Sequence, residues 1–177
     1  MNSRITLVTL FNEESLKKMD ELISSVDEKL CKVPFNRNVN RCEVDTLPFH
    51  LTLSAWDINK KDEVVLMLNS INFNSFKLVV NGLGIMNGKE GSHVLYFNIV
   101  DCDELKALHK AIYSSIPNER YNPDNFKFHI TIHIDQDYEK ILRIKNALEE
   151  GFTPFELEVN SIGLFSIYPA ILIKEIK

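Results

Sequence analysis

The sequence lacks the features of a secreted or membrane-bound protein. Its three cysteines, Cys31, Cys42 and Cys102, are odd in number and show no CxxC spacing, which argues against disulfides and a cysteine-bound metal. The segment Met1–Phe11 has no signal-peptide core or cleavage site, and no apolar run reaches membrane-spanning length. We therefore expect a cytoplasmic protein with free thiols and no membrane partner.

An excess of positive charge is also missing. The chain has 20 Lys and Arg against 25 Asp and Glu, which gives a formal net charge of −5 and a pI near 5.6. Binding a long duplex requires many phosphates to be neutralised, so no large nucleic-acid surface is expected. With only 6 Gly and 6 Pro and a hydrophobic content of 45% over 177 residues, the chain should instead form one globular domain, residues 1–177.

Hydrophobic periodicity predicts strands and helices in alternation. Asn12, an Asp101-x-x-Glu104 capping box and Asp137 mark three helix starts, while Asn87-Gly88 and Gly91 supply a hairpin turn. The predicted strands are Ile5–Phe11, Phe49–Leu53, Phe76–Ile85, His93–Val100, Phe128–Ile134, Phe155–Phe165 and Ala170–Ile176. Two predicted helices carry apolar stripes, between Leu16 and Leu30 and between Leu105 and Ile116, and two more are predicted from about Asp62 to Ile71 and from Asp137 to Gly151.

The two halves of the chain repeat one another in a single register. Phe49-His50-Leu51-Thr52 matches Phe128-His129-Ile130-Thr131 at an offset of 129 − 50 = 79, and 76–84 matches 155–163 at 155 − 76 = 79. Two matches that share an offset without a gap indicate an internal duplication. We expect two lobes related by a pseudo-twofold axis, with the equivalent strands meeting in a central cleft.

Each repeated strand places a histidine and a threonine on one face. Side chains two residues apart along a strand lie about 6.6–7 Å apart on the same side of the sheet. A histidine pair can supply one neutral base and one protonated acid near neutral pH, and threonine hydroxyls can donate to phosphate oxygens. His50 and His129 are therefore the candidate catalytic pair, and Thr52 and Thr131 the candidate substrate-binding residues.

The paired tetrads His50-Leu51-Thr52-Leu53 and His129-Ile130-Thr131-Ile132 resemble the signature of the two-histidine (2H) phosphoesterase superfamily. The resemblance covers nearly the whole chain and is strongest to the bacterial 2′-5′ RNA ligase / RNA 2′,3′-cyclic phosphodiesterase branch. It implies a bilobal α+β fold, with a cleft between two antiparallel sheets flanked by helices. It also implies chemistry that needs no ATP, metal or other cofactor, on RNA 3′ ends or small nucleotides that carry a 2′,3′-cyclic phosphate or a 2′-5′ linkage.

In the mechanism that this resemblance implies, one histidine activates water and the other protonates the departing ribose oxygen. The same groups would run 2′-5′ ligation in reverse, and the sequence leaves open which histidine is the base. A closed duplication of this kind favours a monomer. Two other functions remain open: a metal-dependent phosphoesterase that uses His129, His133 and Asp135 with His50, and a non-catalytic RNA-binding module.

Several further residues could contribute to a site. His133, two residues after Thr131, is predicted to lie on the same strand face as His129 and Thr131 and could contact substrate. His93 and His109 are expected at the surface or at a boundary. Loop arginines could reach a phosphate, and aromatic rings at the cleft rim could stack on a base, although packing is the alternative for the rings. These residues are Arg37, Arg41, Phe11 and Tyr168.

Overall fold

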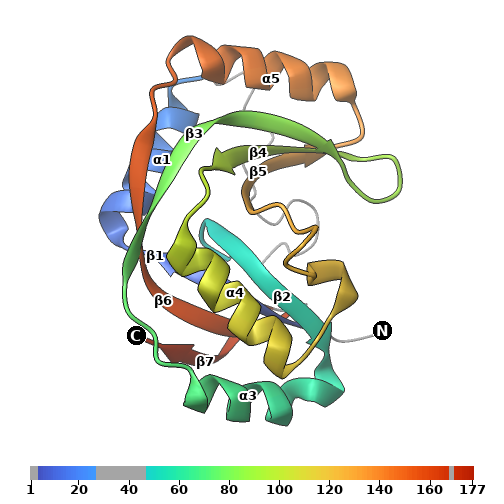
Figure 1. Cartoon of the computed structure of the whole chain (residues 1–177). Helices are drawn as coiled ribbons and strands as arrows, with labels where there is room; N and C mark the ends of the chain where they lie inside the picture. Colours follow the sequence, from blue (N-terminus) through green and yellow to red (C-terminus); the bar gives the residue numbers. More distant parts are fainter. Residues whose placement is uncertain (1–3, 27–46, 168–169) are drawn as a thin grey trace.

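The computed structural model describes residues 4–26, 47–167 and 170–177 and shows an α+β architecture (Figure 1). Within these ranges every predicted strand and helix is present. In chain order the elements are β1 (Arg4–Phe11), α1 (Glu13–Ser24), β2 (His50–Asp57), α3 (Lys61–Ser70), β3 (Phe76–Asn87), β4 (His93–Ile99), α4 (Asp103–Ser115), β5 (His129–Asp135), α5 (Tyr138–Glu150), β6 (Phe155–Ile167) and β7 (Ile171–Ile176). Leu30, predicted to end the first helical stripe, lies outside the described residues.

The strands form one antiparallel sheet in the order β1-β2-β5-β4-β3-β6-β7, and β1 also pairs with β6. The α+β prediction is confirmed, but the two expected sheets are continuous with each other. They are joined where residues 76–80 of β3 pair with residues 155–159 of β6, and again where Leu51 of β2 pairs with Ile130 of β5. The additional β1–β6 pairing closes six of the strands into a ring.

The strand pairing repeats the offset found in the sequence. Leu78 pairs with Leu157 and Leu51 pairs with Ile130, and both pairs are separated by 157 − 78 = 130 − 51 = 79 residues. A residue that pairs with its own repeat lies on the axis relating the two halves. The register is therefore that of a pseudo-twofold axis, which passes through β3 and β6 at one point and through β2 and β5 at the other.

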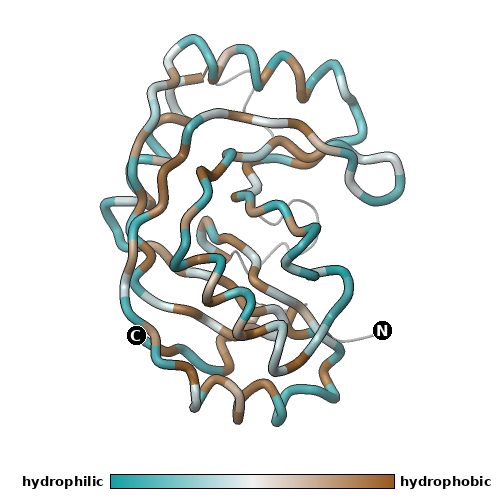
Figure 2. The backbone as a smooth tube through the Cα atoms, in the orientation of Figure 1, coloured by the Kyte–Doolittle hydropathy of each residue, from teal (hydrophilic) through white to brown (hydrophobic). Residues whose placement is uncertain are grey.

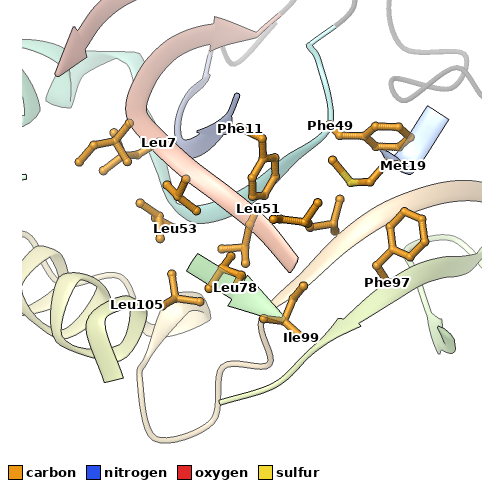
Figure 3. Close-up of a cluster of buried hydrophobic side chains, with 14 of the residues drawn as sticks. Leu7, Phe11, Met19, Phe49, Leu51, Leu53, Leu78, Phe97, Ile99 and Leu105 are labelled. Atoms are coloured by element: carbon orange, nitrogen blue, oxygen red, sulfur yellow. The ribbon is translucent and has the colours of Figure 1, made fainter. Parts of the chain in front are cut away.

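One hydrophobic cluster spans both halves of the chain. Leu51 and Leu53 of β2 belong to this cluster together with residues of β3, β4 and α4, among which Figure 3 shows Leu78, Phe97 and Leu105. Figure 2 shows apolar residues along the strands and an alternation of polar and apolar residues along the helices, as expected when one helix face is buried. Helix α5 contacts β3, β4 and β5, and α4 contacts β2.

Two of the three predicted helix caps are confirmed. Asn12 accepts from the backbone N–H of Ser15 at the start of α1, and Asp137 accepts from that of Lys140 in α5. The predicted capping box at Asp101 is wrong, because α4 begins one residue later and the Asp101 carboxylate instead accepts from Lys106 Nζ at 2.6 Å. Across the described ranges, no helix combines the length and apolarity needed to cross a membrane.

Candidate active site

The two repeated motifs lie side by side where β2 meets β5. Leu51 and Ile130 form the single residue pair between these strands, and both side chains are fully buried in the core. Because side chains alternate along a strand, the flanking residues point to the opposite face. Extending the antiparallel register places His50 beside Thr131 and Thr52 beside His129. The two histidines are then diagonal neighbours, for which Cα separations of about 7–8 Å are typical.

Both imidazoles are held in the same way. Nδ1 of His50 lies 2.9 Å from the carbonyl oxygen of Pro48, and Nδ1 of His129 lies 2.9 Å from that of Lys127. A carbonyl oxygen can only accept, so Nδ1 must carry the proton in each ring. The two contacts are themselves related by 127 − 48 = 79. They leave Nε2 of each histidine with a lone pair when the ring is neutral, and with a donatable proton when it is charged.

Burial lowers the pKa of both histidines. For His50, loss of hydration is the largest effect; the Pro48 carbonyl raises its pKa, and the positive charge that His129 can carry lowers it. For His129, loss of hydration is again the largest effect, the Lys127 carbonyl raises the pKa, and the Lys127 ammonium lowers it. Because each pKa lies below the usual 6.5, both rings are mainly neutral at neutral pH.

Polar groups surround His129 that sequence reasoning missed. Tyr96 and Asn98 of β4 pair with Thr131 and His129, so their side chains share the histidine's face. The Tyr96 ring meets the His129 ring edge to face with 5.6 Å between centroids. Lys127 Nζ donates to the Tyr96 hydroxyl at 2.8 Å. The alternation of Tyr96 and Asn98 along β4 was a usable signal, but their approach to His129 depends on the pairing of β4 with β5.

Apolar groups occupy the equivalent positions around His50. Leu10 and Val8 of β1 pair with His50 and Thr52. Val8 packs with Leu47 and Phe165 in a small cluster separate from the main core, and Leu10 contacts it. The candidate site is therefore symmetric in its four central residues, with an apolar side at His50 and a polar, positively charged side at His129.

Glycines in β3 and β6 make room for large rings next to the site. A Cβ atom at Gly84 would overlap the ring and hydroxyl of Tyr96, and one at Gly163 would lie 2.6 Å from the Phe165 ring. These glycines are equivalent, since 163 − 84 = 79. Gly84 therefore allows Tyr96 to lie against the sheet within reach of Lys127 and His129.

His133 does not share the face of His129 and Thr131, so that prediction is wrong. Tyr96 pairs with Thr131 but Leu95 pairs with His133, so β5 contains one extra residue, Ile132. This bulge turns the next side chain to the opposite face. His133 is buried at 2% exposure, with Nε2 3.6 Å from Asp135, whose carboxylate accepts from Lys140 of α5. The strand geometry therefore leaves His133 beside Asp135 but separates it from His129, another of the proposed metal ligands.

The remaining predicted residues have varied outcomes. His93 is half-buried against the Tyr138 ring, as expected for a boundary residue. His109 was predicted at the surface or a boundary but is 1% exposed, because it faces the core one helical turn from Leu105. Phe11 is also buried in the core, which excludes stacking on a base. Arg37, Arg41 and Tyr168 lie outside the described residues.

A cavity of about 530 Å³ borders the polar side of the site. It lies between the end of β4, helix α4 and the segment that leads into β5. Among its lining residues are Asn98, Lys106, His109, Lys110, Phe126 and Lys127. Among residues 4–26, 47–167 and 170–177, no three His, Cys, Asp or Glu side chains gather in a group that could hold a metal ion.

The sequence matches the model of a protein family. Residues 5–168 match the model of the 2′-5′ RNA ligase superfamily. In a comparison with curated proteins, none matches the sequence significantly.

Several solved structures share the fold. LigT of E. coli, crystallised with ATP, is 14% identical with a TM-score of 0.60, over 98% of this chain and 96% of that one. TT0787 of Thermus thermophilus is 14% identical with a TM-score of 0.61, over 97% and 96%. Usb1 of Kluyveromyces marxianus is 12% identical with a TM-score of 0.52, over 97% of both chains. At these identities the likeness concerns the fold.

Proposed function

Because the chain belongs to the 2′-5′ RNA ligase superfamily, we propose that it is a phosphodiesterase that opens 2′,3′-cyclic phosphates on RNA 3′ ends or small nucleotides without a metal ion. One observation carries the proposal. His50 and His129 are oriented identically by backbone carbonyls, so that two Nε2 atoms are available on one face beside two threonines. Acid and base on a shared face are what opening a cyclic phosphate requires.

In the proposed step, Nε2 of one neutral histidine removes a proton from water as the water oxygen bonds to phosphorus. The bond between phosphorus and one ribose oxygen breaks. The second histidine, protonated at Nε2, gives its proton to that oxygen, and a 2′- or 3′-phosphomonoester is released. The hydroxyls of Thr52 and Thr131 donate to the non-bridging oxygens, where negative charge increases during the reaction.

The symmetry of the pair allows either histidine to act first. Attack and departure occur on opposite sides of phosphorus, and the two imidazoles come from opposite sides of the pseudo-twofold axis. With an RNA 5′-hydroxyl in place of water, the same ring opening joins a 2′-5′ bond: the hydroxyl loses its proton to one histidine as its oxygen bonds to phosphorus, and the departing ribose 3′-oxygen takes a proton from the other. LigT of E. coli has been crystallised with ATP, with 3′-AMP and with NADP+, which supports a nucleotide-sized ligand for this fold.

The test is hydrolysis of the four nucleoside 2′,3′-cyclic phosphates in excess EDTA by wild type, His50→Asn and His129→Asn. His93→Asn is the matched control, because His93 is half-buried and outside the site. We expect activity in EDTA and a loss of about 10²–10⁴-fold in kcat in each site variant, the usual contribution of a general acid or base. Loss of wild-type activity in EDTA would favour the metal-dependent alternative. Full activity in either site variant would refute the two-histidine mechanism.

We further propose that residues 1–177 act as one monomeric unit. The support is the extent of pairing between the halves, because β3 and β6 bond across them and β1 and β6 close the ring. Neither half could keep its sheet partners if separated from the other. Sedimentation equilibrium should give a mass near 20.4 kDa, and a mass twice that would contradict the monomer.

A further inference from the structure

The cavity beside the site has the size and position of a nucleotide subsite. Its volume of about 530 Å³ falls within the range of roughly 300–1,000 Å³ found for small-molecule pockets. Asn98 and Lys127 line it, and both adjoin His129. Asn98 is the cross-strand partner of His129, and the carbonyl oxygen of Lys127 accepts a hydrogen bond from the His129 ring. The Phe126 ring also lines the cavity and lies 6.5 Å from the His129 ring. A ligand in the cavity is therefore next to the reacting phosphate.

A buried histidine in the cavity wall has an unused ring nitrogen. His109 is 1% exposed and is hydrogen-bonded to the backbone of Leu53. Its Nε2 is buried and has no hydrogen-bond partner among the residues that the structure describes. Burial lowers the His109 pKa, which keeps the ring neutral and makes Nε2 an acceptor. A buried acceptor without a partner is costly, and a ligand O–H or N–H would satisfy it if the neighbouring Phe126 ring shifts to uncover Nε2.

Aromatic rings accompany this histidine. The Phe126 ring lies 4.9 Å from the His109 ring, centroid to centroid, and the Phe128 ring lies 5.1 Å from it. Phe126 is half-buried, so part of its ring remains available to a ligand. Aromatic faces of this kind bind single-stranded bases by stacking, without requiring a particular base.

The cavity has lysines that the proposed reaction at the terminal phosphate does not involve. Lys106 is neutralised by Asp101 at 2.6 Å, and Asp124 contributes a carboxylate to the lining. Lys110 and Lys127 are exposed and have no ion-pair partner within the described ranges, and the Lys127 ammonium group donates to the Tyr96 hydroxyl and lies over its ring. Two lysines are thus free to contact a second phosphate.

We propose that this cavity binds the ribonucleotide that precedes the reacting end of an RNA chain. Its base stacks on Phe126, its ribose 2′-hydroxyl or base N–H donates to Nε2 of His109, and the phosphate joining it to the terminal nucleoside lies between Lys110 and Lys127. The inference rests on the proposed function and narrows its substrate to oligonucleotide ends over mononucleotides.

Binding without turnover tests the subsite separately from catalysis. Titration calorimetry compares the dinucleotide ApAp, which ends in a 3′-phosphate, with 3′-AMP on the full chain. We expect ApAp to bind wild type about tenfold more tightly, because it adds one phosphate contact and one stacked base. Lys110→Ala should weaken ApAp binding about fivefold and leave 3′-AMP binding unchanged. Lys17→Ala, an exposed lysine on α1, is the matched control and should affect neither ligand.

A second variant and a salt series sharpen the result. His109→Gln, checked for folding by its thermal transition, should also weaken ApAp binding selectively. For wild type, the slope of log affinity against log salt should be steeper for ApAp than for 3′-AMP by about 0.7, the value for one additional phosphate on a single strand. Equal affinity of wild type for both ligands would overturn the inference. An equal loss of affinity for ApAp and 3′-AMP in Lys110→Ala would also overturn it, because the terminal nucleoside would then occupy the cavity. Neither result depends on whether the cyclic nucleotides are hydrolysed.

Discussion

Lys127 supports His129 directly with its backbone and indirectly, through Tyr96, with its side chain. Its carbonyl oxygen accepts from Nδ1 of His129 at 2.9 Å, and its ammonium group donates to Tyr96, whose ring lies against the same imidazole. At the equivalent position in the other half, Pro48 supplies only the carbonyl. The two histidines are therefore oriented alike but differ in the charge beside them.

Replacing this lysine should change how His129 titrates. Because the Lys127 ammonium lowers the His129 pKa, Lys127→Met should raise that pKa and leave the His50 pKa nearly unchanged. The carbonyl bond is retained, since the backbone is not altered. NMR titration of the imidazole resonances measures both values. Lys106→Met removes a lysine already paired with Asp101 and serves as the control; an equal rise there would show that the effect is not local.

The pH dependence of kcat/KM should have its maximum on the acid side of pH 6.5. Both histidine pKa values are lowered, so the form with one protonated and one neutral ring predominates only between two apparent values below 6.5. Activity should fall above this window as the acid loses its proton, and below it as the base gains one. Profiles from about pH 4.5 to 8.5 on a cyclic nucleotide provide the measurement. A maximum above about pH 7 would contradict the lowered pKa values of the two histidines in the free enzyme.

The glycine beneath Tyr96 should be sensitive to a single methyl group. In Gly84→Ala, Cβ would overlap the Tyr96 ring, so the ring must move away from Lys127 and His129. We expect a loss of about 1–3 kcal/mol in the free energy of unfolding, typical of overpacking, together with lower kcat/KM. Gly82→Ala is a matched control two residues away, because nothing lies within 4 Å of its added Cβ. Chemical denaturation and kinetics on both variants would show whether the ring is the cause.

His133 should contribute to stability without contributing to catalysis. The bulge in β5 directs it to the face opposite His129, where it is buried near Asp135 and Lys140. His133→Gln should therefore lower the melting temperature while kcat/KM stays within about twofold of wild type. A loss approaching that of His129→Asn would contradict this placement and revive the metal-dependent alternative.

The two threonine hydroxyls should each contribute to stabilising the reacting phosphate. Thr52→Val and Thr131→Val keep the shape of the side chain and remove its donor. Hydrogen bonds to charged groups contribute about 1.5–3 kcal/mol, so kcat/KM should fall about 10- to 100-fold in each variant. Thr153→Val, at an exposed position between α5 and β6, provides the control. Kinetics unchanged in both site variants would remove the threonines from the mechanism.

The sequence predicts local structure and the central four residues, because both follow from short-range patterns. Alternation around His50 and His129 and their shared offset place them on equivalent strands, and the pairing of Leu51 with Ile130 shows how those strands meet. The burial of His109 was also accessible, since it lies four residues after Leu105 on the apolar stripe of α4.

What the sequence could not predict depends on the register between distant strands. The bulge at Ile132 moves His133 to the other face, although perfect alternation would have kept it beside Thr131. Tyr96 reaches Lys127 only because β4 pairs with β5 and because Gly84, on β3, leaves space for the ring. Each of these contacts joins segments whose separation along the chain gives no periodic signal.

The two sheets, β2-β1-β6-β7 and β5-β4-β3, are joined unequally at the two points where the axis crosses them. Residues 76–80 and 155–159 form a continuous run of pairs, whereas Leu51 and Ile130 form the sole pair between β2 and β5. A phosphate held by His50 and Thr52 from one strand and by His129 and Thr131 from the other would bridge this weaker seam. Bound substrate would then link β2 to β5. We therefore expect the protein to be most rigid during the reaction and most able to open once product leaves.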